Sequence, residues 1–477
     1  MARSDRSSLA SAPPAPRASQ PLPFASPERL DPVLQDFLEQ ASRQLCAWLG
    51  TAVQRSPLPG LSMLPAVEPQ LDGLAPAALL ADLQVVMDGA FNPNHPGALA
   101  HLDPPPVGAS LAADLICAGL NNNLLAEELS PSLTRLERSL TAWLAERLGL
   151  PRGSGGVAAS GGTLSNLMAL VTARRNRGLA TASDAVVVAS VDAHVSLAKA
   201  LAVMGLPADA LRLIEVDGDG RLLLPALDDE LAALARRGRP VMAVVATAGT
   251  TVRGAVDPLE GMAQICRRRG LWLHVDGAIG AVFGLVESHR SRVAGLELAD
   301  SITINPQKLL GITKTSSLLL LARPQALGEA FQTGLPYMEP SWGGGHGGES
   351  GLQGSRPAEI LKLWLGLRQL GLNGIEAVLD GAIARRRQLQ ALLSGHDRLQ
   401  LRSGAFHLLA FTPAGLDSAG AEAWSQSTRQ RLLQQQLMLS RPRYAGRHHL
   451  KAVLGNPHTG AAELQAVAEV VAASLPA

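Results

Sequence analysis

The chain has 477 residues, a length that suits one large domain together with a smaller one. A formal net charge of +1 gives no reason to expect a nucleic acid as a partner, and no apolar run is long enough to span a membrane, so no membrane partner is expected. The three cysteines are scattered without CxxC spacing, which argues against a disulfide framework or a metal site and fits a reducing, cytoplasmic location.

The N-terminal segment combines a tail with predicted helices. Residues 1–27 are rich in Ser, Ala, Pro and Arg and cannot bury enough apolar surface to offset the entropy of ordering, so we expect a disordered tail, although a transit peptide has a similar composition. Apolar residues recur at helical spacing over residues 30–53, and a second, short helix is predicted over residues 76–87.

The next segments contain a rigid loop and a glycine-rich one. The many Pro and Asn residues of 91–106 force an irregular backbone, which is either part of a pocket or only a structural turn. A helix is predicted over residues 131–148. The stretch 155–170 is interpreted as a small-residue loop that runs into an apolar helix, whose free N–H groups would bind an anion. It matches neither the P-loop nor the dinucleotide fingerprint.

Short apolar runs then alternate with helical segments, which is the pattern of an α/β domain with a mostly parallel sheet. The predicted strands cover residues 185–190, 211–216, 241–246, 271–275 and 301–305, and the predicted helices cover 196–204, 226–236 and 259–269. Further helices and short strands after residue 358 predict a small α+β domain. The predicted parts are the tail (1–27), a helical arm (28–100), the large α/β domain (101–370) and the small domain (371–477).

Polar residues follow the predicted strands where each one ends. His194, Thr247 and Asp276 come at the ends of three strands, and Lys308 comes just after a fourth. Ligands of such sheets bind at the carboxyl ends of the strands. Lys308 has apolar neighbours, and burial there would favour the neutral amine that attacks an aldehyde. Each residue alone would be interpreted as structural, but their convergence indicates a site.

Five stretches, in this order and spacing, resemble the group II pyridoxal-phosphate-dependent amino-acid decarboxylases. They are SGGTLSN (160–166), DAHVSLAKA (192–200), ATAGTTVRGAVDPL (246–259), HVDGAIGA (274–281) and NPQK (305–308). The family includes aromatic amino-acid, glutamate, cysteine sulfinate and diaminobutyrate decarboxylases. The resemblance covers residue 76 to the C-terminus. It implies pyridoxal 5'-phosphate as cofactor, the type I fold of such enzymes for the large domain, and a homodimer with active sites at its interface.

The resemblance also implies roles for individual residues. Lys308 would form the Schiff base with the cofactor aldehyde, and Asp276 would keep the pyridine nitrogen protonated, so that the ring accepts the electrons left by CO2 loss. His194 would stack on one face of the ring, and Ala278 would pack on the other. These side chains would form the centre of the site.

Other residues would hold the rest of the cofactor and the substrate. Gly162 and Thr163 would bind the phosphate, and Thr247 would orient the ring. Gln307 stands where relatives often have histidine, and its amide can still donate to the phosphate. Lys451 stands where many relatives have arginine. A lysine cannot form the paired hydrogen bonds of a guanidinium with a carboxylate, which puts a role of Lys451 in binding the substrate in doubt.

The glycine- and proline-rich segment 331–354 is predicted to be a lid that supplies the proton replacing CO2. Either Tyr337 or His346 would be the donor, and water would donate if neither reaches the site. We favour His346, because imidazole has a pKa of about 6.5 against about 10 for phenol, and because glycines surround it while Pro336 and Pro340 stiffen the other segment.

The predicted reaction is decarboxylation of an L-amino acid to its amine and CO2. The substrate is expected to be small and aliphatic or acidic, such as 2,4-diaminobutyrate, aspartate or cysteine sulfinate. The same fold also supports carbon–carbon lyases and aminotransferases, and a non-catalytic relative that binds the cofactor is the remaining alternative.

Overall fold

The computed structural model describes residues 23–60, 63–314, 316–336, 338, 342 and 345–476. The chain forms two compact units, one of Met1–Thr51 with Gly60–Gly89 and one of Ala52–Pro59 with Ala90–Ala477. The predicted tail, residues 1–27, lies mostly outside the described residues. Its described part, residues 23–27, has an irregular backbone. The four-part division expected from the sequence stays a prediction.

The smaller unit contains the two helices that the sequence predicts, α1 (Pro32–Gly50) and α2 (Pro76–Asp88). α1 begins at Asp31, whose carboxylate accepts hydrogen bonds from the backbone N–H groups of Val33 and Leu34. Many apolar side chains of the two helices remain exposed, among them Leu34, Leu38, Leu45, Leu79, Leu83 and Val86.

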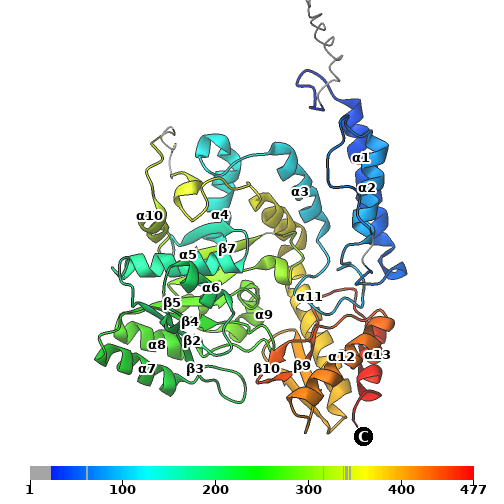
Figure 1. Ribbon diagram of the computed structural model, residues 1–477. Helices are drawn as coiled ribbons and strands as arrows, with labels where there is room; N and C mark the ends of the chain where they lie inside the picture. Colours follow the sequence, from blue (N-terminus) through cyan, green and yellow to red (C-terminus); the bar gives the residue numbers. More distant parts are fainter. Residues whose placement is uncertain are drawn as a thin grey trace, which may run out of the picture. The chain divides into compact units, whose positions relative to one another are not determined.

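The larger unit is built on a seven-stranded sheet in the order β1-β7-β6-β5-β4-β2-β3. Figure 1 labels β7, β5, β4, β2 and β3 of this sheet. Its strands are β1 (Gly155–Ala159), β2 (Val186–Ser190), β3 (Leu211–Ile214), β4 (Val241–Thr247), β5 (Trp272–Gly277), β6 (Ser301–Ile304) and β7 (Ser317–Leu321). The run from β3 through β2, β4 and β5 to β6 is parallel, and β7 is antiparallel to β6 and β1. The predicted α/β class with a mostly parallel sheet is confirmed.

The sheet differs from the prediction at one edge, because neither β1 nor β7 was expected. Residues 155–159, interpreted as a loop, pair with β7 over their whole length. Their small side chains allow close pairing: a Cβ on Gly156 would lie 2.0 Å from the Leu319 carbonyl oxygen. This strand therefore forms through a distant partner rather than through local strand propensity.

Side chains of alternate residues divide the core between the two faces of the sheet. One face packs against α4 (Pro131–Arg147), α7 (Leu224–Arg236), α8 (Leu259–Arg269) and α11 (Ile360–Ser394). The other face packs against α5 (Gly162–Asn176), α6 (Ser196–Val203) and α10 (Gln325–Phe331). Burial on both faces explains why the central strands consist of continuous apolar runs. The remaining helices of this part are α3 (Gly108–Leu120) and α9 (Glu287–Arg290).

The C-terminal part has a core of its own. Three antiparallel strands in the order β12-β9-β8 pack against the end of α11 and two further helices. Their bounds are β8 (Leu399–Ser403), β9 (Leu408–Pro413), β12 (Leu450–Val453), α12 (Ser418–Gln434) and α13 (Ala461–Ala472), and a short hairpin pairs β10 (Arg443–Tyr444) with β11 (Arg447–His448). α11 is interrupted at Gly371, whose φ of 61° is not helical. Over the described part of the chain, every helix is too short or too polar to cross a bilayer.

Candidate active site

A cavity of about 220 Å³ lies at the carboxyl ends of the central strands. Seven of the residues that the sequence singles out line it: Gly162 and Thr163 at the start of α5, His194 after β2, Thr247 at the end of β4, Asp276 and Ala278 at the end of β5, and Lys308 after β6. The structure therefore brings together residues that are up to 146 positions apart, between Gly162 and Lys308. Convergence at this edge is what the parallel strands require.

Lys308 ends a short 3-10 helix, Pro306–Lys308, that follows β6 directly. Burial lowers the pKa of its amine below the usual value, while the carboxylates of Asp276 and Asp103 act in the opposite direction. Burial thus favours the neutral, nucleophilic form of the amine. Asp103 belongs to the proline-rich segment 91–106, whose residues are not among those that line the cavity, so the pocket interpretation of that segment stays a prediction.

Asp276 is 6% exposed at the end of β5. Its Oδ2 accepts a hydrogen bond from Asn166 Nδ2 at 2.8 Å, and its Oδ1 accepts one from the Ala278 N–H at 3.2 Å. Asn166 also lines the cavity, but the sequence analysis did not single it out. The available signal was a buried amide within the apolar first turns of α5, inside the SGGTLSN motif.

His194 lines the cavity in the connection between β2 and α6. Its Nδ1 accepts a hydrogen bond from the backbone N–H of Ser196 at 3.2 Å, so in the neutral ring the hydrogen is on Nε2. Burial lowers the pKa of this imidazole, and the carboxylate of Asp276 only partly opposes the shift. The ring is therefore neutral at pH 7.

The start of α5 offers donors for an anion. The residue that precedes this helix is Gly161, which has no side chain to cap it, and the first turn carries no acidic residue. A Cβ on Gly162 would come within 3.0 Å of the Asn305 amide, so glycine keeps the backbone accessible at this point. Helix N–H groups, a glycine and the Thr163 hydroxyl are donors suited to a phosphate.

Thr247 also fits a bound group. Among the described residues its buried Oγ1 has no hydrogen-bond partner, although it lines the cavity. The backbone N–H of Thr247 donates to Asp257 Oδ2 at 2.8 Å, which fixes the end of β4. A buried hydroxyl without a partner in such a cavity is satisfied when a ligand supplies one.

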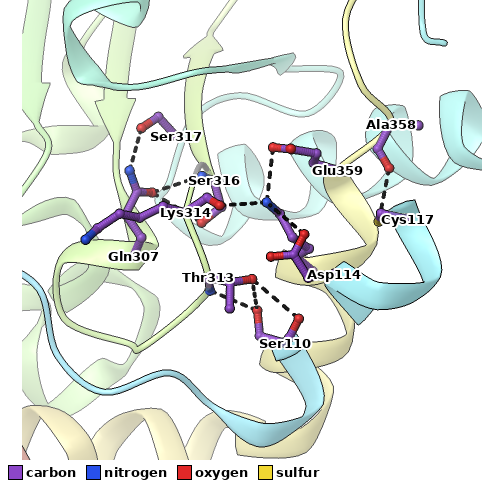
Figure 2. A network of polar contacts seen from close by, with 11 residues as sticks. Ser110, Asp114, Cys117, Gln307, Thr313, Lys314, Ser316, Ser317, Ala358 and Glu359 are labelled. Atoms are coloured by element: carbon purple, nitrogen blue, oxygen red, sulfur yellow. Dashed lines mark hydrogen bonds and ion pairs between the residues drawn. The ribbon is translucent and has the colours of Figure 1, made fainter. Parts of the chain in front are cut away.

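Gln307 lies behind Lys308 and outside the residues that line the cavity. Its Nε2 donates to Ser317 Oγ at 3.0 Å, and its Oε1 accepts from the Ser316 N–H at 3.2 Å (Figure 2). The amide therefore joins the end of β6 to the start of β7. Its predicted contact with the phosphate would require these bonds to rearrange, and it stays a prediction.

The described part of the predicted lid binds to the connection between α3 and α4. The backbone N–H of Glu127 donates to His346 Nδ1 at 3.1 Å, and the Glu127 carboxylate accepts from the Trp342 N–H at 2.9 Å. His346 is not among the residues that line the cavity, and Tyr337 lies outside the described residues. Neither donor assignment is tested by these contacts.

Lys451, on β12, reaches towards the cavity. It is 6% exposed, and its Nζ donates to the carbonyl oxygen of Thr251, a cavity residue, at 3.2 Å. Burial, and to a smaller extent the charge of Lys308, lower the pKa of its amine to about 8. A buried amine that is bonded to a carbonyl favours an anion nearby.

The comparisons with known proteins identify the family. The model of the pyridoxal-dependent decarboxylase conserved domain matches residues 77–410, which is more than half of the chain. The chain belongs to the pyridoxal-dependent decarboxylase family. An L-2,4-diaminobutyrate decarboxylase of Rhizobium meliloti (strain 1021) is 35% identical over 350 residues, which are 72% of this chain and 69% of that protein. A cysteine sulfinic acid decarboxylase of Rattus norvegicus is 30% identical over 369 residues, 73% of this chain and 72% of that protein.

Solved structures of other decarboxylases share the fold. Mouse CSAD superposes with a TM-score of 0.85 at 25% identity, covering 93% of this chain and 99% of that one. Oryza sativa TDC with PLP and tryptamine gives a TM-score of 0.87 at 22% identity and covers 94% of this chain and 99% of that one. The predicted type I fold is therefore confirmed.

The family also confirms the cofactor and the reaction class: the chain is a pyridoxal-phosphate-dependent carboxy-lyase that acts on an amino acid. The cavity suits this cofactor. It holds a buried lysine, a buried carboxylate, an anion cradle at a helix start and a hydroxyl that lacks a partner among the described residues. The carbon–carbon lyase and aminotransferase alternatives have no support from the matched proteins named above.

Proposed function

We propose that this decarboxylase acts on a small aliphatic L-amino acid that carries a second charged group, and that Lys308, Asp276 and His194 contact its cofactor. The observation that carries the assignment of residues is the convergence of a buried lysine and a buried carboxylate in one cavity of about 220 Å³. Support for the substrate class comes from similarity to proteins named L-2,4-diaminobutyrate, cysteine sulfinic acid and acidic amino acid decarboxylases.

Pyridoxal phosphate, when bound, accepts the electron pair left behind as CO2 departs. Asp276 would bind the ring nitrogen and keep it protonated, which strengthens this capacity. Lys308 would hold the cofactor through its amine. The N–H groups at the start of α5 and the Thr163 hydroxyl would hold the phosphate, and Thr247 Oγ1 would donate to the ring.

Two side chains would enclose the ring between them. His194 and Ala278 both line the cavity, where the neutral imidazole provides a flat face and the methyl group leaves room on the opposite side. A small residue is required there, because 220 Å³ leaves little space for a cofactor ring next to a larger side chain. The two residues would thereby fix the plane of the ring.

Lys451 would bind a negatively charged group of the substrate. Its amine is buried, bonds to the carbonyl of Thr251 at the cavity, and lies close enough to Lys308 for the two charges to interact. A single ammonium attracts a carboxylate without the paired geometry of a guanidinium, so it tolerates substrates of different length. This position thus fits a compact acidic substrate better than a diamino acid, whose second ammonium group it would repel.

The proton that replaces CO2 would come from the lid. His346 remains our candidate, and its Nδ1 contact with the Glu127 N–H would have to break before the ring could reach the cavity. Tyr337 is the alternative. If the lid first rests on the connection between α3 and α4 and closes over the cavity afterwards, cofactor binding and proton transfer would be separate steps.

We also propose a cytoplasmic homodimer. Exposed apolar residues gather on α3, namely Leu115, Ile116 and Leu120, and an apolar groove of about 420 Å³ between α4 and α11 includes Trp143 and Leu372. Surfaces of this kind are typical of interfaces between subunits. Free thiols at Cys46, Cys117 and Cys266 fit a reducing compartment. Analytical ultracentrifugation would measure the assembly, and a monomer at micromolar concentration would contradict it.

The substrate can be identified by measuring CO2 release from the purified enzyme loaded with pyridoxal phosphate. The panel should contain the standard L-amino acids together with L-2,4-diaminobutyrate and cysteine sulfinate. We expect the highest kcat/KM for a small substrate with a charged side chain, and none above background for Lys308→Ala. Preference for an aromatic amino acid over all of these would overturn the proposed substrate class.

A further inference from the structure

A line of buried polar side chains leads to Asp276 from behind the cavity. Alternation along β5 places Trp272, His274 and Asp276 on the same face of the strand. The register of the sheet pairs His274 with Ser301 of β6 and Asp276 with Thr303. These positions are buried in the interior between the sheet and α5, where apolar residues are the norm.

The hydrogen bonds along this line have one consistent direction. Asp276 Oδ2 can only accept, so the atom of Asn166 at 2.8 Å from it is the amide nitrogen, Nδ2. Asn166 Oδ1 then faces His274 Nε2 at 3.1 Å, which requires the hydrogen of the neutral ring to be on Nε2. Oδ1 also accepts from the Thr303 hydroxyl at 2.7 Å. The orientation of Asn166 is therefore determined by its neighbours on both sides.

The same logic extends to the far end of the line. Because Nε2 carries the hydrogen, His274 Nδ1 accepts from the Ser301 hydroxyl at 2.9 Å. Ser301 Oγ in turn accepts from Trp272 Nε1 at 2.9 Å. Burial lowers the pKa of His274 to about 4, so the ring is neutral at physiological pH and this pattern of donors persists.

We propose that Asn166 and His274 are positioning residues, which aim the Asp276 carboxylate into the cavity through one directed chain of hydrogen-bond donors from Trp272. Donors aligned in this way polarise one another, so the hydrogen bond to the last acceptor, the Asp276 carboxylate, becomes stronger. Among the described residues Asp276 forms no ion pair within 4.0 Å. Its carboxylate is held by hydrogen bonds from the Asn166 amide and the Ala278 N–H. The inference rests on the contact between Asp276 and the cofactor that is proposed above.

Three variants of the holoenzyme test the chain. His274→Leu removes the donor to Asn166 at similar volume, His274→Gln restores an N–H donor, and Asn166→Asp replaces the donor to Asp276 without a change in size. The readouts are the dissociation constant of pyridoxal phosphate, measured by fluorescence quenching on reconstitution, together with kcat and KM. Thr172→Val is the matched control, because Thr172 is buried in the same helix α5 but its hydroxyl donates to the carbonyl of Met168, away from the chain.

For His274→Leu and Asn166→Asp we expect kcat to fall about tenfold and the dissociation constant of the cofactor to rise about fivefold, with KM within about twofold. His274→Gln should recover most of both losses, which a general packing defect would not predict. Because Asn166→Asp preserves the shape of the side chain, it keeps the test informative if His274→Leu does not fold. If Asn166→Asp and His274→Leu both behave like Thr172→Val, or if His274→Gln loses as much as His274→Leu, the proposal is overturned.

The result can be separated from a failure of the proposed function by adding Asp276→Ala. If Asp276→Ala binds cofactor and turns over like the unmodified enzyme, the proposed role of Asp276 is wrong, and the chain has nothing to position. If Asp276→Ala is inactive while the Asn166 and His274 variants match the control, only the inference about the chain is wrong.

Discussion

The Arg356 guanidinium binds the Glu137 carboxylate through both of its terminal nitrogens, at 2.7 and 2.6 Å, with both side chains almost completely buried. Glu137 belongs to α4, and Arg356 follows the segment 331–354 that is predicted to act as the lid. The backbone carbonyl of Arg356 also accepts from the Leu124 N–H at 2.9 Å. This ion pair therefore fixes the point at which the chain returns from the lid to the core.

Replacing Arg356 should destabilise the fold strongly. Arg356→Met leaves the Glu137 charge buried without its partner, which typically costs about 3–5 kcal/mol in the free energy of unfolding. Urea denaturation followed by circular dichroism would measure it. Adding Glu137→Leu should recover most of the loss, because the pair is then replaced by apolar groups. The exposed pair Arg323–Glu329 is the control, and Arg323→Met should cost no more than about 1 kcal/mol. Equal losses from Arg356→Met and Arg323→Met would contradict this account.

The loop that follows Lys308 is hydrogen-bonded to two helices, α3 and α11, and Lys362 of α11 makes one of these contacts. This fully buried lysine donates to the Lys314 carbonyl at 2.8 Å and pairs with Glu359 at 3.1 Å (Figure 2). Lys362→Met removes the ammonium donor and leaves the Lys314 carbonyl without this hydrogen bond. We therefore expect a loss of about 1–3 kcal/mol in the free energy of unfolding. A thermal melt of the holoenzyme would detect it as a lower Tm. An unchanged Tm would show that the loop is held mainly by the bonds between Thr313 and Ser110.

Sequence patterns predict those parts of the fold that local chemistry determines. β2, β4, β5 and β6 are visible as continuous apolar runs, because both faces of the sheet are covered. β1 is not, because a Gly-Gly-Val-Ala-Ala segment has little strand propensity and depends on β7, more than 150 residues away.

The same distinction holds at the site. Lys308 and Asp276 can be singled out because each follows a strand end within a motif. Asn166 could be located only through its place in the SGGTLSN motif, because its partner Asp276 is 110 residues distant. The orientation of Gln307 also depends on Ser317, which begins the strand β7 that the sequence did not predict, and on Ser316 just before it.

Lys308→Ala should abolish CO2 release, because the substituted side chain can neither hold the cofactor nor assist the release of product. The protein should still fold and bind pyridoxal phosphate weakly through the anion cradle. Absorbance spectroscopy after dialysis against the cofactor should show the visible band of the lysine-bound cofactor in the unmodified enzyme alone. Lys314→Ala is a control in the same loop. A Lys308→Ala enzyme that retains both the band and turnover would require another lysine as the attachment site.

If Lys451 binds the substrate, KM should rise with pH. Its amine has a pKa lowered to about 8, mainly by burial, so it is protonated below that pH and loses its charge above it. The attraction to an anionic group is therefore present at pH 7 and weakens through pH 8 to 9. In Lys451→Arg the guanidinium stays charged, and we expect the rise in KM to disappear over this range. Lys451→Met should have a KM that is higher at pH 7, by about tenfold, and insensitive to pH. Identical pH profiles for the three enzymes would remove Lys451 from the substrate site.

The proton donor of the lid can be identified by comparing His346→Phe with Tyr337→Phe. The variant that lacks the donor should still release CO2 in a first turnover but form amine slowly, and under oxygen it should divert part of the substrate to aldehyde. We expect this for His346→Phe, because imidazoles in general exchange protons near neutrality more readily than phenols. The contact of His346 with the Glu127 N–H adds a second signature, since a ring that must leave this contact makes lid closure part of the rate. Single-turnover measurements of CO2 and amine, with and without oxygen, would separate the two steps. If both variants form amine at the rate of the unmodified enzyme, water delivers the proton and the lid has another purpose.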